Sequence, residues 1–318
     1  MSRTFWLVSS GGKRTIAPST SERQAFRADA IQIEMYYVES GEAIVISRGR
    51  NAILVDGGSG TNTNRNDQVG GVLGSRLARH SLQAIVTSHP HRDHSNFHHA
   101  LVTAHLDRFA AAGALYFDNA TPAAAANWQR LQNWQPNLPF QRVAVADDQA
   151  KDADNRIPLL SGEADAYLLR GSTNATSIKS KKYWSVFLFL RFRDAWMLFT
   201  GDAYKGYENL LLNRLEALNP SAHLLKVTHH GSSGGTSEQV VSSLRPKISI
   251  ASTDSDPGHR LETDVRARLS ESAIYATYDT RRRRHPGKDI IVRTDGRVRQ
   301  EDGFAGILFE VWRREPAL

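Results

Sequence analysis

The 318-residue sequence contains no cysteine, and this absence excludes three kinds of chemistry. Without thiols the chain cannot build a disulfide framework, use a cysteine nucleophile or bind a metal through thiolates. Long apolar runs are also missing, because even one of the longest runs, Val186–Leu190, lies between Ser185 and Arg191. A membrane-spanning helix needs roughly 20 apolar residues, so we expect no membrane span. The N-terminus lacks the apolar segment of a secretory signal, and we expect a cytoplasmic protein.

Positively charged residues are in excess. Forty Lys and Arg residues face 33 Asp and Glu residues, which leaves a formal net charge of +7. Such an excess favours polyanionic partners, because their binding releases counterions. Hydrophobic residues make up 40% and charged residues 23% of the chain, which is ordinary for a globular protein. We therefore expect a folded protein whose partner is nucleic acid or another phosphodiester.

Strand-like and helix-like segments alternate along both halves of the chain, and no change in composition marks a linker. The clearest expected elements are a hairpin over 183–199 and helices over 96–112 and 204–218. Two sheets packed face to face, with helices on both outer sides, accommodate this order. The sequence predicts an α+β fold, a four-layer αββα sandwich formed by one domain over residues 31–318. A polar lead-in over residues 1–30 precedes it.

The strongest chemical signal is the segment from Ser88 to His94, which reads Ser-His-Pro-His-Arg-Asp-His and comes directly after an apolar strand. On a turn that leaves a sheet edge, His89 and His91 can point the same way. Asp93 and His94 then turn back toward the neighbouring position. This arrangement suits two divalent cations side by side, each with nitrogen and oxygen donors at about 2.0–2.2 Å. The alternative is a histidine-rich surface turn.

Two further strands end in residues of metal-ligand type. The apolar segment 196–199 leads to Asp202, and a carboxylate can bridge two metals through its separate oxygens. The segment 224–228 leads directly to His229 and His230. Each motif alone is usually structural, but three such strand ends in one chain together indicate a metal centre.

These motifs resemble those of the metallo-β-lactamase-fold hydrolases. The likeness rests on the His-x-His-x-Asp-His segment and on the strand that ends at Asp202. Asp56, in Val-Asp-Gly-Gly, is similar to a family aspartate that supports the site without binding metal. Within the superfamily, segments 38–43, 226–232 and 258–269 resemble the hydrolase domain of the competence DNA-uptake protein ComEC. The likeness extends over roughly 31–298.

The resemblance implies two divalent ions, zinc or manganese. The implied ligands are His89, His91, Asp93, His94, Asp202 and one of His229 and His230. His89 and His91 would hold one ion with Asp202, and the other ion would share Asp202. His230 is favoured over His229, because it directly precedes the glycine. The family's further histidine is missing, since no histidine lies between 113 and 201, so one site is expected to be weak.

The resemblance also suggests roles around the metals. Asp93 would orient a metal-activated hydroxide, and His259 would donate a proton or contact a phosphate, unless it is only a turn residue. Ser232 and Ser233 would donate hydrogen bonds to substrate, with a turn role as the alternative. Apart from the resemblance, the run Arg281, Arg282, Arg283 and Arg284 together with the net charge of +7 predicts contacts with a phosphate backbone. A solvated loop is the alternative for this run.

These observations predict a metal-dependent hydrolase, and among such enzymes a phosphodiesterase or nuclease acting on nucleic acid. One alternative is a hydrolase of a small lactone, thioester or other ester, because the same kind of site serves those reactions. Another is a non-catalytic regulatory module of the same fold. A defence or DNA-uptake assembly is the kind of partner that the resemblance suggests.

Overall fold

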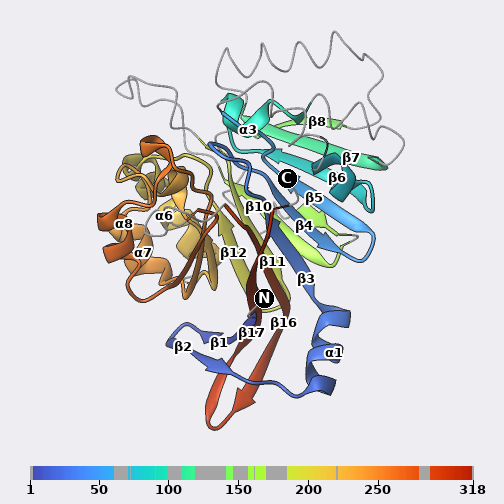
Figure 1. Ribbon diagram of the computed structural model, residues 1–318, viewed down its shortest axis with the longest axis vertical. Helices are drawn as coiled ribbons and strands as arrows, with labels where there is room; N and C mark the ends of the chain where they lie inside the picture. Colours follow the sequence, from blue (N-terminus) through green and yellow to red (C-terminus); the bar gives the residue numbers. More distant parts are fainter. Residues whose placement is uncertain are drawn as a thin grey trace.

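The computed structural model describes residues 3–60, 71, 73–89, 91–98, 109–118, 141–145, 157–160, 162–169, 185–219, 221–278 and 287–316. Within these ranges the strands form two sheets that face each other, and helices lie on the outside (Figure 1). The expected α+β sandwich is confirmed. No helix in the described part of the chain is long and apolar enough to cross a membrane.

The larger sheet runs through both ends of the chain. Its strands are β1 (Arg3–Ser9), β2 (Gly12–Ile16), β3 (Ile31–Met35), β4 (Ile44–Arg48), β5 (Asn51–Val55), β6 (Ser81–Thr87), β7 (Phe109–Asp118), β8 (Gln141–Val145), β16 (Asp289–Glu301) and β17 (Phe304–Arg314). They lie in the order β2-β1-β17-β16-β3-β4-β5-β6-β7-β8. Strands β5 to β8 are parallel, so their carboxyl ends share one edge of the sheet.

The smaller sheet lies opposite. Its strands are β9 (Ile157–Leu159), β10 (Ala164–Leu169), β11 (Phe187–Phe192), β12 (Ala195–Phe199), β13 (Leu224–Lys226), β14 (Ile248–Ala251) and β15 (Ala273–Ala276). They lie in the order β15-β14-β13-β12-β11-β10-β9. Strands β11 and β12 form the expected antiparallel hairpin, whereas β12 to β15 are parallel. The carboxyl ends of β12, β13 and β14 therefore also share one edge.

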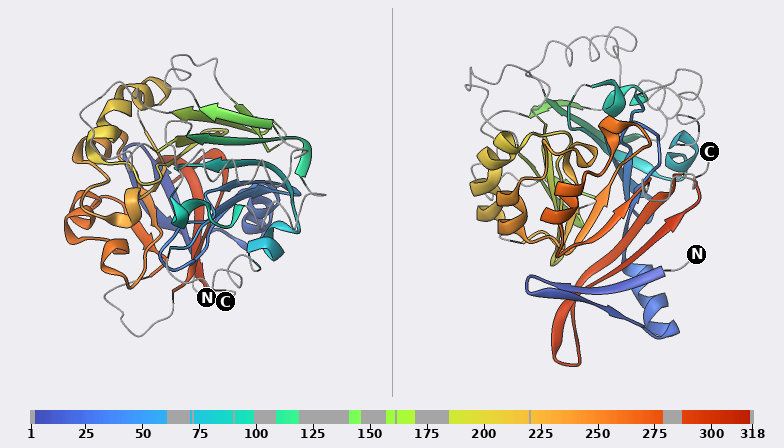
Figure 2. Two further views of the ribbon diagram at one scale, coloured as in Figure 1. Left: turned by 90° about the horizontal axis from the view of Figure 1, so that it is seen from above. Right: turned by 60° about the vertical axis from the view of Figure 1, so that its left-hand side comes forward.

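The position of strand β12 between two layers explains why its sequence is continuously apolar. Met197 packs in the core between the two sheets. Trp196 and Leu198 pack in a second core with helices on the outer face. These helices are α6 (Lys205–Leu218), α7 (Glu238–Leu244) and α8 (Thr263–Arg268), and both figures show them covering the smaller sheet (Figures 1 and 2). A strand that lies between two layers is apolar on both faces, which explains why all five residues of β12 are buried.

The first thirty residues, expected to form a polar lead-in, contain two strands and the helix α1 (Thr20–Asp29). Strand β1 pairs with β17, about three hundred residues away, and Phe5 packs against Phe26 of α1. Ser19 and Glu22 form a capping box at the start of α1. This local signal was visible in the sequence, but the pairing partner of β1 was not. The domain boundary at residue 31 stays a prediction.

Two other expectations concern particular segments. The helix expected over 96–112 is wrong at its end, because β7 begins at Phe109. The arginine run 281–284 lies outside the described residues.

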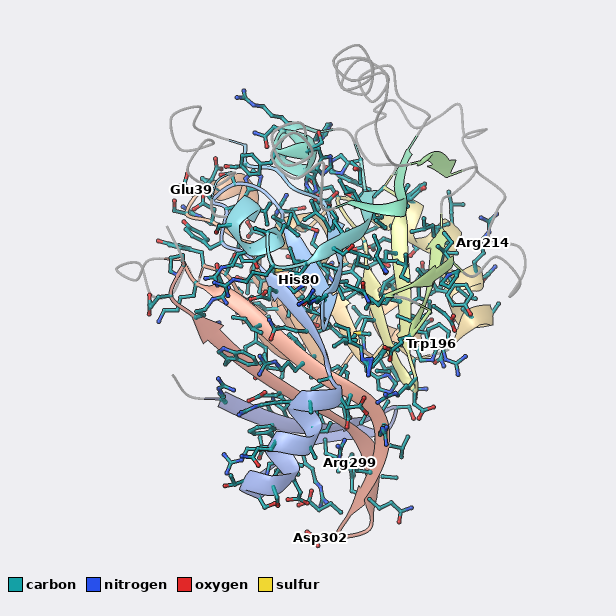
Figure 3. All side chains as sticks on the ribbon, turned by 90° about the vertical axis from the view of Figure 1, so that its right-hand side faces the viewer. Glu39, His80, Trp196, Arg214, Arg299 and Asp302 are labelled. Carbon is teal, nitrogen blue, oxygen red and sulfur yellow. The ribbon has the colours of Figure 1, made fainter. Side chains whose placement is uncertain are left out.

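The hairpin of β16 and β17 extends away from the sandwich. Figure 3 places Arg299 and Asp302 at that end of the molecule and Glu39 at the other.

Candidate metal centre

The expected ligands lie just beyond the carboxyl ends of strands, at one edge of the sandwich. They are His89 and His91 after β6, Asp93 and His94 in the short helix α3 (Arg92–Ser95), Asp202 after β12, and His229 and His230 in the 3-10 turn η3 (Thr228–Gly231). Carboxyl ends of parallel strands are the usual place for a ligand site in α/β sheets. Segments that are more than a hundred residues apart in the sequence therefore meet at one point.

Four of these side chains form a tight cluster. Ligand-type atoms of Asp93, His94, Asp202 and His230 all lie within 4.8 Å of one another. The Nε2 atom of His94 lies 3.3 Å from the Nε2 atom of His230 and 3.3 Å from Oδ2 of Asp202. Oδ1 of Asp202 lies 3.5 Å from Nε2 of His230, and Oδ2 of Asp93 lies 3.7 Å from the same nitrogen. This cluster is almost entirely buried, with Asp93 the most exposed member.

His94 and His230 are oriented by hydrogen bonds at Nδ1, the ring nitrogen that points away from the cluster. Nδ1 of His94 lies 2.9 Å from Oδ2 of Asp56, and Nδ1 of His230 lies 3.1 Å from the carbonyl oxygen of Ser252. A carboxylate and a carbonyl only accept hydrogen bonds, so both Nδ1 atoms carry the proton. In the neutral rings, both Nε2 lone pairs therefore face the cluster. Asp56 has the supporting position that the resemblance implies.

The two carboxylates of the cluster carry negative charge in a buried place, so they repel each other unless positive charge lies between them. Burial opposes a charge on His94, but the carboxylates of Asp202, Asp56 and Asp93 raise its pKa well above the usual value. Burial likewise opposes a charge on His230, and Asp202 raises its pKa to about 9. Conversely, His230 and His94 outweigh burial and hold the pKa of Asp202 well below its usual value. Without a metal, protons on the imidazoles supply the positive charge.

The donor set fits a divalent metal ion. A tetrahedral ion with bonds of about 2.0–2.1 Å has donor atoms roughly 3.3–3.4 Å apart, and the closest contacts here are 3.3 Å. Imidazole and carboxylate without thiolate suit zinc, manganese or iron. Asp93, His94, Asp202 and His230 could therefore hold one ion.

A second group of imidazoles also lies near Asp202. Nε2 of His89 and Nε2 of His229 each lie 3.8 Å from Oδ2 of Asp202. The ring of His91 lies edge-on to that of His89, with centroids 4.5 Å apart. Among the described residues, Nε2 of His89 and Oδ1 of Asp202 are buried without a hydrogen-bond partner. Burial lowers the pKa of His89 to about 3, so its ring stays neutral and can act as a donor to a metal.

The turn that carries His229 and His230 is conformationally unusual. Both residues have left-handed backbone angles, with φ of 51° and 53°. Such a conformation costs roughly 1–2 kcal/mol for each residue other than glycine. Thr228 anchors the turn, because its hydroxyl donates to Oε1 of the buried Glu208 at 2.5 Å. Strain of this kind is typical of functional sites.

The ends of β6 and β12 fit against each other only because residue 201 is glycine. Gly201 has φ of +55°, and a Cβ atom there would lie 2.5 Å from Cβ of Ser88. Ser88 in turn donates from its backbone N–H and its hydroxyl to Asp56, at 2.8 and 2.7 Å. The glycine thus allows Asp202 to lie beside the His89 turn.

The expected catalytic residues Asp93 and His259 lie at the cluster. His259, in the 3-10 turn η4 (Pro257–His259), has its Nε2 atom 3.6 Å from Oδ2 of Asp93. Ser233 donates to Oδ1 of Asp264 at 2.7 Å, and the hydroxyl oxygen of Ser232 is buried. A role of these two serines in substrate binding stays a prediction, as does that of the arginine run 281–284.

Sequence reasoning assigned no role to a charged pair behind the cluster. Lys226 and Glu42 form an ion pair, and neither side chain is exposed. Burial opposes the charge of Lys226, but the carboxylates of Glu42, Asp202 and Asp56 raise its pKa. A lysine within the otherwise apolar segment 224–227 was the available signal.

Comparisons with known proteins bear on the fold. No protein-family model and no curated protein matches the sequence. Among solved structures, the metallo-β-lactamase fold protein YhfI from Bacillus subtilis is similar at a TM-score of 0.50 with 14% identity, over 77% of this chain and 96% of that one. A variant of the β-hydroxylase CmlA is similar at a TM-score of 0.51 with 14% identity, over 78% of this chain and 52% of that one.

These likenesses agree with the architecture of the chain. Two mixed sheets face each other between helices, and the His and Asp side chains gather at the carboxyl ends of their strands. The chain therefore has the metallo-β-lactamase fold.

Proposed function

We propose that this protein is a metal-dependent hydrolase. The observation that carries the proposal is the cluster of Asp93, His94, Asp202 and His230, in which two imidazole Nε2 atoms lie 3.3 Å apart among carboxylates. Packing alone gives no reason for this arrangement, because it buries two carboxylates and two imidazoles together. A divalent ion would satisfy all four side chains together.

The residues of the chain suit a hydrolytic reaction at such an ion. When bound, zinc lowers the pKa of a coordinated water to about 7, which makes hydroxide available at neutral pH. Asp93 is the more exposed carboxylate of the cluster and can orient the attacking oxygen through Oδ2. His259 lies beside it with a side chain 21% exposed, where it can hold a proton for a leaving oxygen. No serine or cysteine nucleophile is required.

Within this reaction class, we favour a phosphodiester substrate and in particular nucleic acid. The net charge of +7 and the arginine run 281–284 support a polyanionic substrate. The resemblance of segments 38–43 and 226–232 to the hydrolase domain of ComEC points the same way. Service in a DNA-uptake or defence assembly is part of the same proposal.

Two other activities remain as alternatives, and removal and return of metal also tests them. A small lactone or thioester would need no basic surface and would bind without a strong dependence on salt. CmlA is described as a diiron β-hydroxylase from Streptomyces venezuelae, so a protein of similar fold performs a reaction other than hydrolysis. Activity that returned only with iron and an oxidant would favour that chemistry here.

Removal and return of metal tests the proposal. We expect metal-stripped protein to be inactive and Zn²⁺ or Mn²⁺ to restore cleavage, because the cluster then holds its cation. The substrates to compare are single-stranded DNA, double-stranded DNA, RNA and bis(p-nitrophenyl) phosphate, with a lactone and a thioester as controls. Cleavage by the stripped protein in the presence of a chelator would contradict the proposal.

Replacing the four arginines 281–284 with alanine tests the choice of nucleic acid. We expect weaker binding and a flatter plot of log K against log salt, because each lost phosphate contact removes roughly 0.7–0.9 from the slope. Fluorescence anisotropy with labelled single-stranded and double-stranded DNA measures both quantities. The matched control replaces the same four residues with lysine, which keeps the charge. An unchanged slope in the alanine variant would assign the run to a solvated loop.

A further inference from the structure

A salt bridge is fully buried directly behind the metal cluster. Lys226 is the last residue of β13, and its side chain and that of Glu42 both have 0% exposure. Besides its ion pair with Glu42, the ammonium donates to the carbonyl oxygen of Gly201 at 2.9 Å. Burying two charges costs several kcal/mol for each ion, so such a pair is weak evidence of a gain in stability. Another role has to account for it.

The pair joins the two turns that carry the carboxylates of the cluster. On one side, Gly201 directly precedes Asp202 in the turn after β12 of the smaller sheet. On the other side, the backbone N–H of Glu42 donates to the carbonyl oxygen of Asp93 at 2.9 Å. Lys226 thus links the backbone next to Asp202 with the backbone of Asp93, across the space between the two sheets.

The Lys226 ammonium also contacts a second group of potential metal ligands through Glu42. Ligand-type atoms of Glu42, Asp56 and His94 lie within 4.8 Å of one another, and all three residues are buried. Lys226 supplies a cation to this group through its ion pair with Glu42. The carboxylate of Glu42 is therefore engaged by a fixed charge of the protein itself, which leaves the neighbouring cluster at Asp202 for the metal.

We propose that Lys226 and Glu42 are positioning residues, which act through the turns of Asp202 and Asp93 to set the spacing of the metal ligands. This inference rests on the proposed metal-dependent function. Partners behind metal ligands typically change metal affinity by a factor of ten to a hundred when they are removed. The Lys226–Glu42 pair should have an effect of this size.

The test uses Lys226→Met and the double variant Lys226→Met with Glu42→Met in the full-length chain. Zn²⁺ affinity is measured by competition with a chromophoric chelator, the Co²⁺ absorption spectrum reports the ligand geometry, and urea denaturation of the metal-free protein reports stability. We expect Lys226→Met to weaken Zn²⁺ binding tenfold to a hundredfold and to alter the Co²⁺ spectrum. The double variant should regain stability, because no unpaired charge remains, but not Zn²⁺ affinity.

Arg299→Met is the matched control. Arg299 donates to Oδ1 of the buried Asp295 at 2.8 Å, and it lies toward the hairpin end of the molecule, away from Glu39 (Figure 3). Its loss should lower stability and leave Zn²⁺ affinity within about twofold, since only ligand-supporting partners change metal affinity tenfold or more.

The outcomes separate the two proposals. Wild-type protein that binds no Zn²⁺, Co²⁺ or Mn²⁺ would overturn the proposed function and this inference with it. Normal metal binding by the wild type together with wild-type affinity and spectrum in Lys226→Met would overturn the inference alone. If Lys226→Met does not fold, the double variant decides. Recovery of both stability and Zn²⁺ affinity there would show that the pair only supports the fold.

Discussion

Replacement of Asp202 by alanine should abolish hydrolysis and leave the chain folded. Its two oxygens face His94, His230, His89 and His229 at 3.3–3.8 Å, so this one carboxylate is shared by both groups of imidazoles. Removal of an outer partner costs up to about a hundredfold in metal affinity or activity, and we expect the loss of Asp202 to exceed that. Zn²⁺ titration and a cleavage assay measure the effect, and circular dichroism checks the fold.

The pKa of His230 shows whether the Asp202 carboxylate interacts with this imidazole as we infer. In the metal-free protein, Asp202 raises the pKa of His230 to about 9 because it stabilises the imidazolium. The alanine variant should therefore show a lower His230 pKa by NMR titration. Asp302→Asn, at the tip of the β16–β17 hairpin (Figure 3), is the carboxylate control for a parallel Asp202→Asn variant. Undiminished activity in Asp202→Ala would remove the metal mechanism.

Replacement of Gly58 by alanine should damage the site through the backbone alone. A Cβ atom at residue 58 would lie 2.5 Å from the carbonyl oxygen of Arg92, the carbonyl carbon of Asp93 and the backbone nitrogen of His94. Backbone atoms cannot rotate away, so the turn with two expected ligands has to move. Overpacking of this kind typically costs about 1–3 kcal/mol, and we expect at least a tenfold loss of Zn²⁺ affinity as well.

Gly206→Ala is the matched control for this change. Residue 206 lies in the first turn of α6, and apart from its chain neighbours and the backbone of its own helix no atom lies within 4 Å of a Cβ atom placed there. Alanine is favoured over glycine in a helix by up to about 1 kcal/mol, so this variant should be unchanged or slightly more stable. Urea denaturation and Zn²⁺ titration of both variants make the comparison. Equal behaviour of the two variants would show that the contact at Gly58 can relax without cost.

Local sequence patterns predicted the elements whose partners are close in the chain. The hairpin of β11 and β12 consists of two largely apolar segments separated by Arg193 and Asp194, and antiparallel neighbours of this kind need no distant information. Helix α6 likewise agrees with the periodicity of 204–218. The strand pairing of β1 with β17 could not be predicted in this way, because its two halves lie at opposite ends of the sequence.

For the candidate site, the residue types and their strand-end positions were readable in the sequence. Three apolar segments end in histidine or aspartate, and parallel strands in an α/β sheet deliver such ends to one edge. The sequence also favoured His230 over His229, and the structure places His230 in the four-residue cluster. Whether these side chains bind metal stays a prediction.

The sequence by itself therefore determined the fold class and the identity of the polar groups that meet at one edge, since both depend on apolar periodicity and on the residues at the end of each strand. Only the tertiary structure decided how these groups are supported. The backbone contact of Gly58 with His94 and the link from Gly201 through Lys226 to Glu42 join residues far apart in the chain. Distances between atoms on two different sheets depend on how the sheets pack, and no local pattern encodes them.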